Sequence, residues 1–232
     1  METTPLTTKN ELKQGGIAII DYGSQYTQLI ARRIREQNVY AEVFAHDADQ
    51  DWIDQHQPNA YILSGGPNSA YEADAPQLPS FILKSGKPIL GICYGMQLLT
   101  LAFDGEVAAA THREYGRATS THTPQSPLMD NLPDTLEVWM SHADRIEQAP
   151  KGFIPLAQSE NSPFAAIGHL EKNYYAVQFH PEVTHTKKGK ILLGNFLFLI
   201  CKIKRNWSSK DQRLKLIKDI KEQVGNDKVI CG

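Results

Sequence analysis

The chain has 232 residues, of which 41% are hydrophobic, and its formal net charge is -2. This is enough apolar material for one sizeable core, while the near-neutral charge and the short apolar runs argue against nucleic-acid and membrane partners. The three cysteines, Cys93, Cys201 and Cys231, favour a reducing compartment over a disulfide framework, so we expect a cytoplasmic protein.

The two ends of the chain differ from its body. Residues 1–15 are polar and lack the apolar stretch of a signal peptide, which predicts a disordered leader. Residues 202–232 hold nine Lys or Arg against four Asp or Glu, a balance of +5, so the first 201 residues carry -7. This asymmetry predicts that the tail is a separate unit.

The first half of the chain alternates predicted strands with predicted helices. A continuous apolar run at residues 16–21 is typical of a strand buried on both faces, and Ser24 is expected to cap a helix over residues 25–37. Three more strands are predicted at residues 39–44, 60–63 and 88–92, with helices near 51–55, 81–83 and 97–101. This order predicts an α/β fold, a doubly wound, mostly parallel sheet with helices on both faces. In such sheets the ligand site lies beyond the carboxyl ends of the strands.

After Phe103 the pattern changes to short β-like runs separated by turn signals. They lie at residues 107–110, 118–123, 136–140, 154–158, 164–170 and 174–179. This region predicts antiparallel strands and a small additional antiparallel sheet. Residues 189–201 are apolar around most of their circumference and predict a buried helix.

Cys93 lies between Gly91 and Gly95, at the point where an apolar strand gives way to a helix. This is the glycine–x–nucleophile–x–glycine spacing of a nucleophile elbow, in which residues without a Cβ relieve crowding at a sharp turn. The helix N-terminus at the turn favours an anionic nucleophile. The alternative interpretation, a buried cysteine in a hydrophobic strand, is the common one for a cysteine alone.

A cysteine nucleophile needs a base, and the base needs an orienting group. His180 follows an apolar run and is held extended by Pro181, so that Glu182, two residues on, points the same way and can accept a hydrogen bond from the ring. Upstream, Ser64-Gly65-Gly66-Pro67 ends a buried strand. Glycine there lets the backbone approach a ligand closely, and free N–H groups would stabilise an oxyanion. The alternative interpretation is an ordinary Gly-Pro turn.

These three stretches, residues 64–67, 91–97 and 180–182, resemble the motifs of the class I (triad) glutamine amidotransferases, and the likeness extends over about residues 16–201. The resemblance implies a nucleophile at Cys93, a base and acid at His180 and an orienting carboxylate at Glu182. It implies an oxyanion hole from the backbone N–H groups of Gly66 and Tyr94. It implies glutamine contacts from Gln97, Ser141, His142, Ala143 and Asp144.

Longer stretches, at residues 21–27, 113–116, 138–142 and 180–186, resemble the branch of this family whose ammonia serves amination of XMP to GMP. That resemblance implies a glutaminase domain over 16–203. It also implies a linker and the start of an ATP-pyrophosphatase domain over 204–232, where an apolar stripe on a Lys-rich helix precedes a strand. ATP and Mg belong to that further domain, through which any oligomer would form, and the glutaminase half needs no metal or organic cofactor.

The sequence departs from the family pattern at two positions, and three alternative functions stay open. Ala143 and Ala176 stand where the family usually has glycine, and alanine at 143 costs on the order of 1 kcal/mol if the position needs a positive φ. The alternative functions are an amidotransferase subunit of another pathway, a γ-glutamyl hydrolase or cysteine peptidase on the same scaffold, and a non-catalytic gating module.

Overall fold

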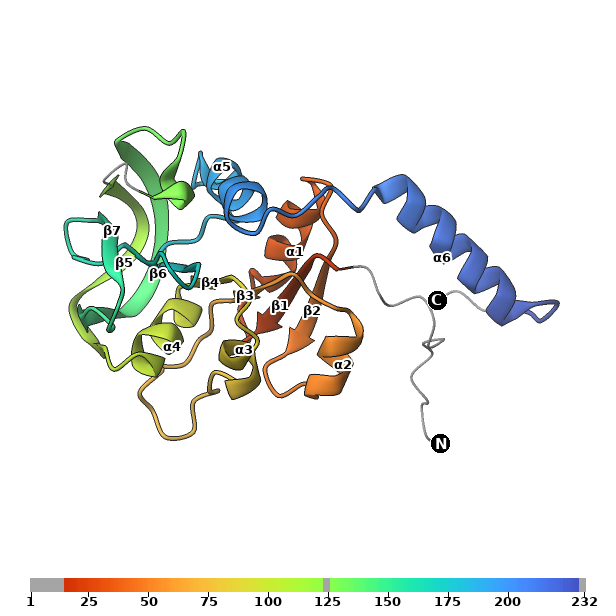
Figure 1. Cartoon of the computed structure of the whole chain (residues 1–232), viewed down its shortest axis with the longest axis horizontal. Helices are drawn as coiled ribbons and strands as arrows, with labels where there is room; N and C mark the ends of the chain where they lie inside the picture. The colour runs from red at the N-terminus through yellow and green to blue at the C-terminus, as the bar shows by residue number, and fades with distance from the viewer. Residues whose placement is uncertain (1–14, 123–125, 230–232) are drawn as a thin grey trace.

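The computed structural model describes residues 15–122 and 126–229, without the side chains of 111–113. The predicted leader lies almost entirely outside the described residues, as do Cys231 and most of the predicted final strand. The described strands form one mixed sheet in the order β2-β1-β3-β4-β9-β8-β7-β5-β6 (Figure 1). Five neighbouring strands are parallel: β2 (Ala41–Ala45), β1 (Ile17–Asp21), β3 (Ala60–Leu63), β4 (Ile89–Ile92) and β9 (Tyr174–Val177).

Helices cover both faces of the parallel strands, as predicted (Figure 1). One face carries α1 (Thr27–Arg35) and α5 (Gly189–Gly194), and the other carries α2 (Gln50–Gln55), α3 (Ser80–Lys84) and α4 (Tyr94–Ala102). The two cores divide the residues of β1 by alternation: Ile17 and Ile19 pack with α1, while Ala18 and Ile20 pack with α2, α3 and α4. Burial on both faces explains why these strands are continuous apolar runs.

The antiparallel half continues the same sheet, which corrects the expectation of a separate small one. It contains β8 (Ala166–His169), β7 (Ile154–Gln158), β5 (Glu106–His122) and β6 (Thr135–Gln148). The predicted run at 107–110 and the described part of the run at 118–123 belong to the single strand β5, while Thr123 lies outside the described residues. The prediction split β5 because an irregular stretch between Ala109 and Glu114 breaks its alternation.

The first and last helices of the body also differ from the sequence prediction. Helix α1 begins at Thr27, and its N-cap is Tyr26 rather than Ser24. Ser24 forms a turn just before the helix, in which its hydroxyl accepts a hydrogen bond from the Tyr26 N–H at 3.1 Å. The predicted helix at 189–201 is α5 followed by a π-helical segment, η2 (Asn195–Ile200).

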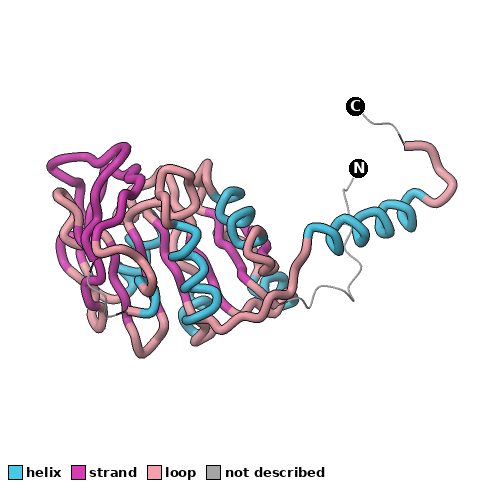
Figure 2. The backbone as a smooth tube through the Cα atoms, turned by 90° about the horizontal axis from the view of Figure 1, so that it is seen from above, coloured by secondary structure: helices cyan, strands magenta, loops and turns pink. Residues whose placement is uncertain are grey.

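The carboxyl-terminal helix α6 (Ser209–Val224) projects from the body (Figure 2). None of its residues is buried, and its apolar stripe includes the exposed side chains of Leu214, Ile217 and Ile220. The last backbone contacts of the body are made by Asn206 and Trp207, whose N–H groups both donate to Asn38 O. No helix within the described residues is long and apolar enough to cross a membrane.

Candidate active site

Cys93 occupies the apex of a sharp turn between β4 and α4. Its backbone has φ 53° and ψ -106°, a left-handed conformation that few residues with a Cβ adopt. Such a conformation costs on the order of 1–3 kcal/mol and persists where the surroundings enforce it. Its own N–H donates to Val177 O at 2.8 Å, which ties the apex to β9.

The two flanking glycines are required by close backbone approach. A Cβ at Gly91 would lie 2.6 Å from Gly95 O and 2.8 Å from Met96 N. A Cβ at Gly95 would overlap the carbonyl of Leu63 at the end of β3 and lie 2.6 Å from its Cβ. The glycine spacing therefore reflects steric demands of the elbow, as the sequence predicted.

His180 and Glu182 form a buried pair beside the elbow. His180 Nδ1 lies 2.7 Å from Glu182 Oε1, and Glu182 is fully buried. Because the carboxylate only accepts, Nδ1 carries the proton, and Nε2 is left to face Cys93, which lines the same cavity. The backbone around the pair is anchored too, since Thr186 Oγ1 donates to His180 O at 2.7 Å and Arg33 Nε donates to Glu182 O at 2.9 Å.

The surroundings of His180 decide its charge. Burial of the ring lowers its pKa, but the hydrogen bonds to Cys93 and Glu182 and their negative charges act more strongly, so the pKa of His180 rises to about 10. The ring of Tyr26 packs edge-on against it at 5.1 Å between centroids. On another side, a Cβ on Gly65 would lie 3.2 Å from His180 Cε1, so this glycine leaves room for the imidazole.

A cavity of about 360 Å³ opens above these residues. Eight of the ten predicted site residues line it: Gly66, Cys93, Gln97, Ser141, His142, Ala143, Asp144 and His180. Glu182 lies behind His180, and Tyr94 turns its side chain away to donate to Pro76 O at 2.6 Å. The cavity is also lined by eight residues that were not predicted as site residues: Gly23, Ser24, Gln25, Tyr26, Pro67, Asn68, Ser69 and Tyr115.

Gly66 lies against the side chain of Tyr94, the residue that follows the nucleophile. A Cβ on Gly66 would lie 3.2 Å from Tyr94 Cγ and 2.7 Å from Tyr22 O, so only glycine fits between these residues. Tyr94 is the first residue of α4, a position whose N–H has no acceptor within the helix. Among the described residues, no hydrogen-bond acceptor is found for the Gly66 N–H. Tyr94 at the helix start and Gly66 after β3 therefore each offer a candidate N–H donor near the elbow.

Residues 141–144 of β6 form the wall opposite α4. Cys93 Sγ lies 3.7 Å from Ser141 O, and the carboxylate of Asp144 accepts a hydrogen bond from the Tyr71 hydroxyl at 3.1 Å. Neither Ala143 nor Ala176 has a positive φ among the described residues, so alanine carries no backbone strain at either position. The destabilisation expected for alanine at position 143 under a positive φ therefore does not occur.

Gln178 is a site residue that the sequence analysis missed. It is fully buried directly after β9, and its side-chain amide donates to Cys93 Sγ at 3.8 Å. Its own carbonyl oxygen, Oε1, has no hydrogen-bond partner in the described part of the chain. A glutamine inside the apolar run 174–179 was the available signal, because a buried amide in such a run calls for a specific partner.

Comparison with known proteins identifies the class. Residues 18–200 match the family model "Glutamine amidotransferase class-I". A glutamine amidotransferase structure from Thermotoga maritima shares the fold, with a TM-score of 0.62 and 22% identity over 91% of this chain and 93% of that one. The chain belongs to the class I glutamine amidotransferase family.

Within that family, the chain is similar to curated GMP synthases. The chain is 50% identical over 216 residues to "GMP synthase [glutamine-hydrolyzing]" of Thermosipho melanesiensis, covering 93% of this chain and 42% of the relative. It is 47% identical over 228 residues to the protein of the same name from Dehalococcoides mccartyi, covering 98% and 43%. The chain thus spans about two fifths of the length of the curated relatives it matches.

Proposed function

We propose that this chain is the glutaminase part of a GMP synthase, in which Cys93, His180 and Glu182 hydrolyse glutamine to glutamate and ammonia. The observation that carries the proposal is His180, which lies 2.7 Å from Glu182 through Nδ1 and lines the same cavity as Cys93. Nucleophile, base and orienting group in this order make up a cysteine hydrolase triad.

The first half of the reaction forms a thioester. The Cys93 thiolate attacks the carboxamide carbon of glutamine, and the oxygen that becomes negative is received by the N–H groups of Gly66 and Tyr94. His180, protonated at neutral pH because its pKa is raised to about 10, gives its Nε2 proton to the departing nitrogen. The C–N bond breaks, ammonia leaves and a γ-glutamyl thioester remains on Cys93.

The second half releases glutamate. Neutral His180 removes a proton from water, whose oxygen attacks the thioester carbon through the same oxyanion site. The C–S bond breaks, the thiolate is restored and the imidazolium is regenerated. Glu182 keeps the proton of Nδ1 in place throughout, so that Nε2 always faces the reacting atoms.

Glutamine itself is held by polar groups across the cavity. Gln97 lies in α4 four residues after Cys93, and its buried Oε1 has no partner in the described part of the chain, which leaves it free to accept a substrate N–H. The Asp144 carboxylate lies on the opposite wall and suits the substrate ammonium. The backbone of Ser141, His142 and Ala143 completes this wall.

The rest of the proposed function concerns protein beyond this chain. In a GMP synthase the ammonia aminates XMP on an ATP-dependent domain, which uses ATP and Mg, and the glutaminase half supplies only the ammonia. The relatives named GMP synthase, which are more than twice as long as their match to this chain, support this part. We assign 16–203 to the glutaminase domain and 204–232 to the linker and the start of the ATP-pyrophosphatase domain.

The proposal is tested by labelling with 6-diazo-5-oxonorleucine, a glutamine-like electrophile, followed by peptide mass analysis. We expect modification at Cys93, protection by glutamine, and none at Cys201, the other described cysteine, whose thiol has a pKa raised by burial. Cys93→Ala should abolish labelling and glutamine hydrolysis, whereas Cys201→Ala should leave both intact. Turnover of glutamine by Cys93→Ala, or faster hydrolysis of γ-glutamyl peptides than of glutamine, contradicts the proposal.

A further inference from the structure

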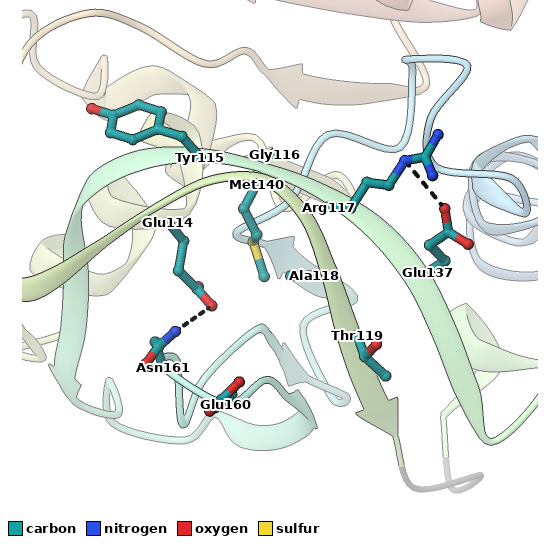
Figure 3. A pocket seen from close by; sticks show the side chains of 10 residues that line it. All are labelled: Glu114, Tyr115, Gly116, Arg117, Ala118, Thr119, Glu137, Met140, Glu160 and Asn161. Atoms are coloured by element: carbon teal, nitrogen blue, oxygen red, sulfur yellow. Dashed lines mark hydrogen bonds and ion pairs between the residues drawn. The ribbon is translucent and has the colours of Figure 1, made fainter.

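Glu114 and His142 form a buried acid–base pair between two cavities. They occupy opposite positions in the β5–β6 ladder, and His142 Nε2 lies 3.1 Å from Glu114 Oε2. His142 lines the cavity of Cys93, whereas Glu114 lines a second cavity of about 570 Å³, shown in Figure 3. The pair therefore joins the wall of the active site to a region outside it.

The imidazole of His142 is held at both ring nitrogens. Nδ1 lies 2.9 Å from Asp144 O, a carbonyl that only accepts, so Nδ1 carries a proton. A second proton lies between Nε2 and the Glu114 carboxyl group, because two acceptors at 3.1 Å would repel each other. Burial of the ring outweighs the opposing effects of Glu114 and the Asp144 carbonyl, so the pKa of His142 lies below its usual value. The ring thus links the Glu114 side chain to the backbone of Asp144.

Glu114 is itself anchored on its other side. Ser159 Oγ donates to Oε1 at 3.2 Å. Asn161 Nδ2 donates to the same oxygen at 3.4 Å, the contact drawn in Figure 3. The Glu114 side chain is only 7% exposed. A buried carboxyl group with three partners is a fixed support rather than a solvated surface charge.

The support lies where the ladder itself is interrupted. The register passes from Ala109↔Asp144 to Glu114↔His142, so four residues of β5 lie opposite the single residue Ala143 of β6. Residues beside such an irregularity lose regular ladder hydrogen bonds. Side-chain hydrogen bonds from Glu114 through His142 to Asp144 span this interruption.

We propose that Glu114 is a positioning residue for glutamine, which acts through His142 to hold residues 141–144 against the nucleophile. The inference rests on the proposed function. Ser141 O lies 3.7 Å from Cys93 Sγ, so a shift of this segment moves the wall closest to the reacting atom. Glu114 does not line the cavity of Cys93, and its effect therefore falls on substrate binding rather than on the triad.

The test compares two reagents on the same variants. The diazo analogue of glutamine reports on glutamine binding through its inactivation constant KI, and iodoacetamide reports on Cys93 alone. For Glu114→Ala we expect KI to rise roughly tenfold, the scale of one well-placed hydrogen bond, with the iodoacetamide rate within about twofold of the parent protein. Glu114→Gln should restore KI, because its amide donates to His142 Nε2 and still accepts from Ser159.

Three further variants sharpen the test. Glu160→Ala is the matched control, because Glu160 lines the same second cavity but is exposed. The double variant Glu114→Ala/His142→Ala should have the same KI as His142→Ala, since Glu114 acts through that ring. If Glu114→Ala does not fold, Glu114→Asp, which withdraws the carboxylate by one methylene, replaces it with the same expectation.

An unchanged KI in the folded Glu114 variant overturns the inference, as does an equal loss with both reagents. Additive effects of the two alanine substitutions also overturn it. The proposed function fails by a different result: the parent protein reacts with iodoacetamide at Cys93 but not with the glutamine analogue. The two failures are therefore distinguishable.

Discussion

Gly95, in the first turn of α4, lies directly against Leu63, the last residue of β3. Its N–H donates to Ser64 O at 3.0 Å, and a Cβ on it would lie 2.6 Å from Leu63 Cβ and 2.8 Å from Leu63 C. The helix that follows the nucleophile is thereby docked on the strand that precedes Gly66. One close contact thus sets the distance between the elbow and the proposed oxyanion hole.

Gly95→Ala should therefore damage stability and the site together. The added methyl group meets backbone atoms that cannot move aside, and we expect a loss of about 1–3 kcal/mol in the free energy of unfolding with slower labelling of Cys93. Urea denaturation and iodoacetamide kinetics measure the two effects. Gly194→Ala is the matched control, because its methyl group would meet the flexible end of Gln37. There the gain in helix propensity, about 1 kcal/mol, offsets the contact. Equal stability of the two variants would refute this account of the elbow.

Glu182→Gln should shift the pH dependence of glutamine hydrolysis. The hydrogen bond and the charge of Glu182 both raise the pKa of His180, and the amide removes the charge. His180 must be protonated to give a proton to the departing nitrogen, so kcat/KM falls at the alkaline pH where His180 loses that proton. In the variant this fall should occur at lower pH. At neutral pH the rate should fall by about 10²–10⁴. Glu171→Gln, an exposed carboxylate, is the control. An alkaline limb that stays in place argues against His180 as the acid.

The same substitution predicts a pH-dependent change in stability. The pKa of His180 lies above its usual value of 6.5 in the folded protein, so its protonated form stabilises the fold fully below 6.5. This contribution is lost as pH rises through about 10. Glu182→Gln should therefore lower the melting temperature more at about pH 6 than at about pH 10. A larger loss at the higher pH would contradict the assignment of charge.

The parallel half of the fold was predictable because burial on both faces leaves a plain signal. The predicted strand at 60–63 and the structural β3 have the same bounds, and the strand, turn and helix around Cys93 lie where the glycine spacing placed them. Distances between Cys93, His180 and Glu182 follow from that sheet. Sequence spacing alone does not give them, because β4 and β9 are neighbours through a long connection.

The antiparallel half was harder because its functional residues break the apolar pattern. β6 alternates buried and partly buried positions over 14 residues, but His142 and Asp144 occupy two of the buried ones. A hydropathy pattern therefore ends the strand at 140, short of the site. Gln178 was missed for the opposite reason, since one polar residue inside an apolar run leaves the strand prediction intact. In both places the hydropathy pattern fails to reveal a polar side chain that lies at the candidate site.

Gln178→Met should slow the chemistry of Cys93 without weakening the fold. Methionine has a similar volume but cannot donate to the Cys93 sulfur, so the Cys93 thiolate loses a hydrogen bond. Iodoacetamide labelling should therefore slow by roughly three- to tenfold. The buried Oε1 without a partner in the described chain disappears too, so the melting temperature should stay equal or rise. The exposed Gln223→Met is the control. Unchanged labelling would mean that the 3.8 Å contact does not stabilise the nucleophile.

A chain that ends after Ser208 should fold and label like the full chain. Helix α6 contributes no buried residue, while Asn206 and Trp207 retain their contacts with Asn38 in the shortened chain. The melting temperature and the KI of the glutamine analogue should therefore be unchanged. Ending the chain after Lys202 provides the contrast, because it removes the buried Ile203 and both contacts to Asn38, and should cost about 1–3 kcal/mol. If loss of α6 alone weakened glutamine binding, the helix would belong to the glutaminase domain rather than to a linker.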